Sequence, residues 1–174
     1  TGRWVMAEVA GVGGRWAHGS YRASYRPDPP GRAGYAVERR ETAVDWSKLP
    51  QAVENNESAI RNALADEGEQ VHTYTHLSHV YGQGSSIYTT YLFRLGDSDG
   101  QAMDRWHKLK SAGAEQIVAS GGTISHQHGV GRDHRDYLIA EKGALGLAAI
   151  NSLCQLFDPA GQMNPGKLLP DEQS

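Results

Sequence analysis

Residues 121–131, "GGTISHQHGVG", combine two imidazoles with several glycines. His126 and His128 are spaced so that both rings lie on one side of an extended chain. Imidazole is the side chain best suited to moving a proton near neutral pH. The flanking glycines, which include Gly129 and Gly131, allow a bulky ligand to approach the backbone closely. We therefore expect a binding or catalytic site in this segment, although the motif alone does not identify a reaction.

A His-x-His pair also permits metal binding, and other histidines are present. His72 and His76 are spaced to share one face of a strand, with His79 on the other face. No His-Glu-x-x-His motif occurs, and no cysteine cluster or carboxylate lies at ligand spacing from His126. A metal-dependent hydrolase that uses His126 and His128 stays open as an alternative, but our site assignment contains no metal.

Two further residues could be reactive but have ordinary structural explanations. Tyr88 lies in "GSSIYTTYLF", which is a strand pattern in which tyrosine commonly packs. Cys154 lies within a helical pattern with no basic neighbour in the sequence, so we expect an inert, buried thiol. Neither residue would indicate a site by itself.

The composition limits the classes of protein that this chain can represent. With 174 residues, 39% of them hydrophobic, the chain can bury the core of one domain. The net charge of −3 argues against a nucleic-acid surface, which needs clustered excess lysine and arginine. The single cysteine excludes an intrachain disulfide and favours a reducing, cytoplasmic location. No apolar run approaches the roughly 20 residues of a membrane span.

Strand and helix patterns follow one another along the chain. A strand is predicted over residues 35–46, and a helix follows, with a stop at Gly68. A hairpin is predicted with strands near 70–80 and 86–95. The capping-box pair Ser98 and Gln101 begins a second helix that ends at Gly121 and presents one apolar face, which includes Met103.

A last helix is predicted over about 136–157, and a proline-containing irregular tail follows it. Residues 1–32 are dense in glycine, arginine and proline, so we expect a short strand at 4–9 and otherwise irregular chain. This order of elements predicts an α+β fold, in which helices pack on one face of an antiparallel sheet.

The stretches "GGTISHQHGVGRDHRDYL" and "FDPAGQMNPGKLLP" resemble the C-terminal end of FAD-linked oxidases of the vanillyl-alcohol-oxidase type. "HLSHVYGQGSSIYTTYLF" and "ETAVDWSKL" resemble bacterial members similar to alkyldihydroxyacetonephosphate synthase. The resemblance implies a ferredoxin-like cap domain over residues 33–174, with 1–32 as an irregular N-terminal segment that is compatible with a truncated part of the same domain. It also implies that the FAD-binding N-terminal domain is absent from this chain.

The resemblance assigns roles to individual positions. It implies that Tyr88 is the general acid/base and that His126 and His128 handle protons and hold substrate oxygens. Gln127 replaces the middle residue of the family's histidine run and is assigned to substrate binding. Arg26 is assigned there as well, because the family's Tyr-x-Arg-Asp segment reads "YRPD" here, with proline in place of its arginine. The positions implied near the cofactor are Gly129, Gly131, Asn164 and Lys167.

The function implied is that of an FAD-dependent oxidase/transferase resembling alkyldihydroxyacetonephosphate synthase, with ether-lipid-type chemistry. FAD would be bound mainly by the missing domain of the same polypeptide, so this chain alone is expected to be inactive. The substrate would be a small or lipid-like molecule, and a homodimer and a membrane-peripheral location are compatible with this function. One alternative keeps the fold but makes the enzyme an FAD-dependent dehydrogenase of a 2-hydroxy acid such as D-lactate or glycolate. A non-enzymatic interaction domain is a further alternative.

Overall fold

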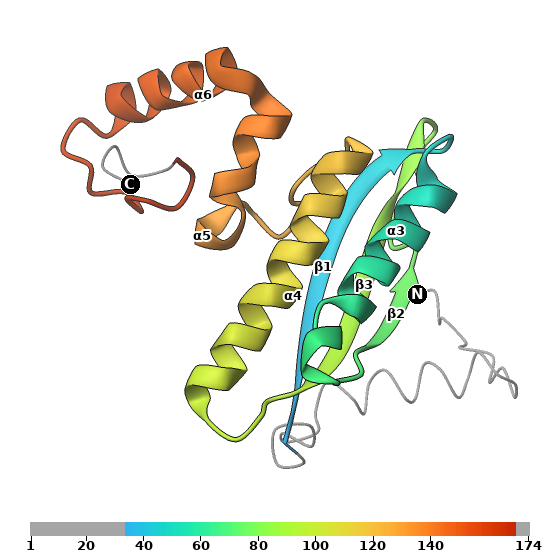
Figure 1. Ribbon diagram of the computed structural model, residues 1–174. Coiled ribbons are helices and arrows are strands. Elements are labelled where there is room, and N and C mark those ends of the chain that lie inside the picture. The colour runs from blue at the N-terminus through green and yellow to red at the C-terminus, as the bar shows by residue number, and fades with distance from the viewer. Residues whose placement is uncertain (1–33, 170–174) are drawn as a thin grey trace, which may run out of the picture. The chain divides into compact units, whose positions relative to one another are not determined.

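The computed structural model describes residues 34–169. Within them the chain forms three strands and several helices (Figure 1): β1 (Tyr35–Asp45), α3 (Leu49–Asn62), β2 (His72–His76), β3 (Gly84–Arg94), α4 (Asp99–Ser120), α5 (Gly131–His134) and α6 (Leu138–Phe157). This order confirms the predicted succession of elements from the first strand to the last helix. The short strand predicted at 4–9, the proposed domain boundary at 32/33 and Arg26 lie outside the described residues.

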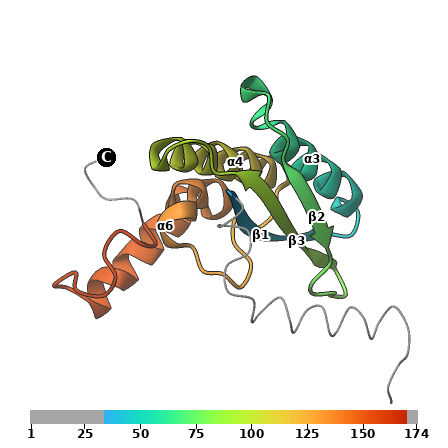
Figure 2. The ribbon, with the colours of Figure 1, turned by 90° about the horizontal axis from the view of Figure 1, so that it is seen from below.

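The sheet has three antiparallel strands in the order β1-β3-β2. The helices α3 and α4 lie together over one face of it (Figures 1 and 2). The predicted α+β class is therefore confirmed. The succession β-α-β-β-α matches the first five elements of the β-α-β-β-α-β ferredoxin-like arrangement.

The main core lies between the sheet and these two helices. Successive residues of a strand face opposite sides, so Ile87, Tyr91 and Phe93 of β3 point toward the helices and are buried. The largest apolar cluster joins residues of both helices, β3 and the segment before β2: Ile60, Leu64, Val71, Tyr91, Phe93 and Leu109. The neighbouring positions of β3, such as Ser86 and Tyr88, point to the opposite face of the sheet.

The ends of the helices follow local signals in the sequence. The Ser98 hydroxyl accepts a hydrogen bond from the backbone N–H of Gln101 at 3.2 Å, so the predicted capping box begins α4. Gly121 ends α4 in the left-handed conformation with φ of 65°. The helix α3 ends earlier than predicted, at Asn62, because a 3-10 turn over Ala65–Glu67 leads to the left-handed Gly68.

Several predictions about individual residues and boundaries are wrong. Met103 is 51% exposed, whereas Leu109 is buried. The two residues are six positions apart, and at 3.6 residues per turn this spacing sets their side chains about 120° apart around the helix. Cys154 is exposed, because among the described residues α6 buries only Leu138 near its start. The last helix, in contrast, is confirmed: it was predicted over about 136–157 and spans Leu138–Phe157, with a 3-10 turn over Arg135–Tyr137 before it. The strand β2 spans only His72–His76.

Part of α6 packs against α4. Leu138 joins Ala114, Ile117 and Ile124 in a second apolar cluster. Farther along, Gly143 interrupts the helical backbone with φ of 68° and ψ of 170°. Beyond this kink several large apolar side chains are exposed, including Leu145, Leu153, Leu156 and Phe157. Within residues 34–169, no helix combines the length and the apolar character needed to cross a membrane.

Candidate functional site

The face of the sheet opposite α3 and α4 carries a row of polar side chains, one from each strand. Glu41 of β1 pairs with Tyr88 of β3, and Tyr88 pairs with His76 of β2. Directly opposite residues in antiparallel strands point to the same face, so their side chains are neighbours. The His76 and Tyr88 rings are stacked, with centroids 5.0 Å apart and an interplanar angle of 30°.

The histidine motif reaches this row because residues 121–130 run along the edge of β1. The backbone N–H of Thr123 donates to the carbonyl of Ala43 at 3.2 Å, and that of His126 donates to the carbonyl of Glu41 at 3.3 Å. A Cβ atom on Gly122 would lie 2.5 Å from the Thr42 hydroxyl. Gly122 therefore lets this loop approach β1, a role within the fold that the glycine pattern alone did not predict.

The Glu41 carboxylate is the centre of the cluster. Its side chain is only 2% exposed, and Oε1 lies 3.1 Å from Nδ1 of His126, while Oε2 lies 3.2 Å from Nε2 of His128. The Ser78 hydroxyl donates to Oε1. Burial acts to raise the pKa of Glu41, but the hydrogen bonds from Ser78, His126 and Ser86 outweigh it, so the pKa is lowered. The ionised carboxylate thus fixes the orientation of both imidazoles of the motif.

The three residues predicted to be catalytic are brought together by these contacts. The Tyr88 ring lies 5.6 Å from the His128 ring in an edge-to-face arrangement. His128 therefore contacts both Tyr88 and Glu41, and Glu41 in turn contacts His126. A phenol beside a carboxylate-oriented imidazole can give and accept protons within one cluster. The catalytic roles themselves stay predictions.

A second group of side chains surrounds His126. Its Nε2 lies 3.0 Å from the Tyr81 hydroxyl, and the His79 and His126 ring centroids are 5.4 Å apart. Gln127 has a left-handed backbone, with φ of 61°, and its amide Nε2 lies 3.2 Å from Nε2 of His79. Ligand atoms of Glu41, His79 and His126 all lie within 4.8 Å of one another, close enough to bind one metal ion.

Three of the four residues predicted near the cofactor line a different hollow. Gly131, Asn164 and Lys167 are among the residues around a hollow of about 770 Å³ between α6 and the tail. The guanidinium of Arg135 donates to the carbonyl of Gly166 at 2.7 Å and so holds the tail in place. Lys167 supplies a cation to this hollow. The cofactor-binding roles of these residues stay predictions.

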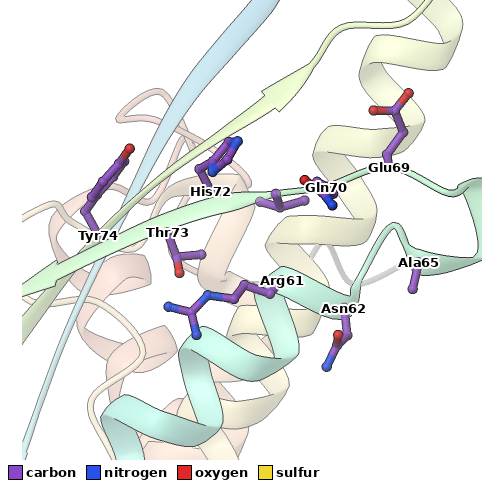
Figure 3. Close-up of a pocket in the computed structure, with 9 residues that line it drawn as sticks. Arg61, Asn62, Ala65, Glu69, Gln70, His72, Thr73 and Tyr74 are labelled. Atoms are coloured by element: carbon purple, nitrogen blue, oxygen red, sulfur yellow. The ribbon is translucent and has the colours of Figure 1, made fainter.

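Another hollow, of about 470 Å³, lies between α3 and β2 (Figure 3). Arg61 of α3 and Thr73 of β2 lie on its helix side, whereas His72 and Tyr74 point to the other side of the strand (Figure 3). None of the residues assigned to the site lines this hollow. We therefore give it no part in the chemistry.

The site residues assigned from the sequence did not include Glu41, His76, His79 or Tyr81, although His76 and His79 were considered as metal ligands. The hairpin pattern contained a signal for His76, since pairing of the two strands sets it opposite Tyr88. Glu41 had no local signal, because the pairing of β1 with β3 and the return of the 121–130 loop bring it to His126 from 85 residues away. The absence of a nearby carboxylate in the sequence therefore gave no information about the folded site.

Residues 13–168 match the family described as FAD linked oxidases, C-terminal domain. The alkyldihydroxyacetonephosphate synthase of Caenorhabditis elegans is 27% identical over 81% of this chain and 24% of its own length. The "Uncharacterized FAD-linked oxidoreductase YgcU" of Escherichia coli K12 is 28% identical over 76% of this chain and 28% of its own length. A "Probable D-lactate dehydrogenase, mitochondrial" of Danio rerio is 30% identical over 80% of this chain and 25% of its own length.

A solved structure of alkyldihydroxyacetonephosphate synthase has the same fold, with a TM-score of 0.58 at 20% identity. The structural match covers 87% of this chain and 24% of the synthase chain. This chain therefore spans about a quarter of the length of these relatives. The resemblance stated from the sequence motifs is confirmed. The chain belongs to the FAD linked oxidases and carries their C-terminal domain.

Proposed function

We propose that this chain is the substrate domain of an FAD-dependent oxidase/transferase with chemistry like that of alkyldihydroxyacetonephosphate synthase. The observation that carries the proposal is the contact of His128 with both Glu41 and Tyr88. This arrangement gathers a base, a weak acid and an orienting carboxylate on one face of the sheet. The name of these relatives, alkyldihydroxyacetonephosphate synthase, supports a product that is an alkyl derivative of dihydroxyacetone phosphate. We propose an acylated dihydroxyacetone phosphate and a fatty alcohol as the substrates.

The contacts of the two histidines suggest different tasks. Both nitrogens of His126 have partners, Glu41 and Tyr81, so His126 is suited to positioning. Nε2 of His128 lies 3.2 Å from Oε2 of Glu41. In the tautomer that carries its proton on Nε2, toward this carboxylate, Nδ1 is the basic nitrogen. In the proposed reaction His128 Nδ1 removes a proton beside the substrate carbonyl, and the Tyr88 hydroxyl exchanges a proton with the departing or entering oxygen. FAD, when bound, supplies the redox-active ring.

The exposed part of α6 supports an FAD-binding domain of the same polypeptide as the partner. Leu145 is 85% exposed, Leu156 72% and Phe157 81%. Apolar surface of this kind usually marks a site of contact with another protein part. The hollow that contains Lys167 lies beside the same helix, so the proposed domain would cover both. A cytoplasmic location, a homodimer and peripheral membrane contact stay predictions.

The second candidate is a dehydrogenase of a small 2-hydroxy acid. The 30% identity to the probable D-lactate dehydrogenase of Danio rerio favours it. In this reaction His128 would accept the proton of the substrate hydroxyl while the cofactor accepts the hydride.

The test uses the holoenzyme, in which this chain is joined to its FAD-binding domain. Under anaerobic conditions, acyl-dihydroxyacetone phosphate with a fatty alcohol should give exchange of acid for alcohol, while the visible flavin band persists at the end. Tyr88→Phe should reduce this exchange about 100-fold or more, which is the usual contribution of a general acid or base. Lasting bleaching of the flavin by glycolate or D-lactate would instead support the dehydrogenase. If neither occurs, both proposals fail.

A further inference from the structure

We propose that Glu41, His79 and His126 form a binding site for a divalent transition-metal ion such as Zn²⁺. The three side chains come from β1, from the segment between β2 and β3, and from the loop after α4. The proposal concerns binding by this chain and does not rest on the reaction proposed above. It also differs from a site formed by His126 and His128, since His128 contacts the other oxygen of Glu41.

The distances between the donor atoms suit a tetrahedral ion. Nδ1 of His126 and Nδ1 of His79 lie 3.1 Å and 3.5 Å from the same atom, Oε1 of Glu41. With Zn–ligand bonds of about 2.0–2.1 Å, neighbouring donors of a tetrahedral site are about 3.3–3.4 Å apart. The two measured distances lie on either side of this value. Shifts of a few tenths of an ångström in two side chains would therefore complete the coordination.

The other nitrogen of each imidazole already has a partner. Nε2 of His126 lies 3.0 Å from the Tyr81 hydroxyl, and Nε2 of His79 lies 3.2 Å from the Gln127 side-chain amide. Histidine ligands of metals almost always donate their second N–H to such a group, which fixes the tautomer with the free lone pair toward the ion. The amide nitrogen of Gln127 is the atom that faces His79 in the structure. A flip of this amide would turn its oxygen toward the ring, and the oxygen would then accept the N–H of His79.

Charge and exposure also suit a cation. Glu41 is the one carboxylate of the group and is 2% exposed, so its negative charge is shielded from solvent. The His79 side chain is 41% exposed, which gives an ion a route from the solvent. Two nitrogens and one oxygen favour Zn²⁺ and similar ions over Mg²⁺ or Ca²⁺, which prefer oxygen ligands. Three protein ligands leave a coordination position for water or a substrate oxygen.

The experiment is titration of this chain with ZnCl₂ by isothermal calorimetry, with bound zinc counted after dialysis. We expect one Zn²⁺ per chain. His79→Ala should weaken the affinity at least about 100-fold, beyond what loss of a supporting hydrogen bond costs. Glu41→Gln should have a similar effect, and His79→Ala keeps the test valid if Glu41→Gln does not fold. His72→Ala, an exposed histidine on the same face of the sheet, is the matched control and should bind as the parent does.

His128→Ala distinguishes the two possible histidine pairs. Parent-like affinity in this variant, with loss in His79→Ala, supports the proposed ligands. Equal affinity of the parent and His79→Ala would overturn the proposal, as would failure of the parent to bind zinc stoichiometrically. Because binding is measured without FAD or turnover, these results are independent of whether the proposed reaction is correct.

Discussion

Replacing Glu41 by alanine should destabilise the chain by about 2–3 kcal/mol. The carboxylate accepts a hydrogen bond from Ser78 and contacts His126 and His128 at 3.1 and 3.2 Å. A hydrogen bond to a charged group contributes about 1.5–3 kcal/mol. The cost of removing the carboxylate from water offsets part of the combined contribution of its three contacts. The lowered pKa of Glu41 shows that the favourable contacts win over burial.

The size of the loss is limited because the groups left behind can find water. The side chains of His126 and His128 are 15% and 37% exposed, so neither becomes a fully buried orphan. Glu41→Gln should cost about half as much, since the amide oxygen still accepts one hydrogen bond.

Urea unfolding followed by circular dichroism, in buffer containing EDTA, measures this loss. With a slope of about 2 kcal/mol/M, Glu41→Ala should lower the midpoint by about 1–1.5 M. Glu54→Ala is the control, because Glu54 is exposed on α3 and such changes stay within about 0.5 kcal/mol. If Glu41→Ala costs no more than Glu54→Ala, the carboxylate does not hold the cluster together.

Three further predictions concern the surroundings of the site. Gly129→Ala should lower the free energy of unfolding by about 1 kcal/mol, because Gly129 has a φ of 75°, which an alanine adopts only with strain. Gly82→Ala is the control: a Cβ atom meets nothing within 4 Å at either position, but Gly82 has no positive φ, so this change should not destabilise the chain in the same urea assay. The pKa of Glu141 is lowered from its ordinary value of 4.5, because the hydrogen bonds from Lys142 and the Ile124 N–H outweigh the opposing effect of burial. Its stabilisation is thus present above pH 4.5 and lost as the pH falls through the lower folded value, so Glu141→Gln should unfold more easily than the parent at pH 7 and equally easily in strong acid. Leu156→Lys should reduce binding of a hydrophobic dye by the isolated chain, and unchanged dye fluorescence would argue against an apolar docking face on α6.

The sequence predicted those parts of the fold that depend on local signals. The capping pair at Ser98 and the glycine stop at Gly121 act over a few residues, and both ends of α4 lie where these signals indicate. Cys154 was predicted to be buried, but the burial of a helix face depends on what packs against it, and an apolar pattern does not contain that information. The same limit applies to Met103, whose angular position on α4 decided its exposure.

The candidate site was predictable in its reactive residues but not in its organisation. The proton-transfer chemistry of imidazole and the resemblance to a family together indicated Tyr88, His126 and His128. The carboxylate that orients the two histidines could not be found, because strand register and a long-range loop contact bring it there. His79 was assigned to the face of a strand, yet it lies beyond the end of β2, where its ring approaches His126.

The most direct test of the central claim is the turnover number of the holoenzyme carrying His128→Asn, measured with whichever substrate the parent converts. Glu41, Tyr88 and His128 form one proton-transfer cluster in this account, so kcat should fall about 100- to 10,000-fold, while FAD content stays that of the parent. His72→Asn, on the same face of the sheet, should retain full activity. Parent-like turnover of His128→Asn with a full complement of FAD would contradict the account.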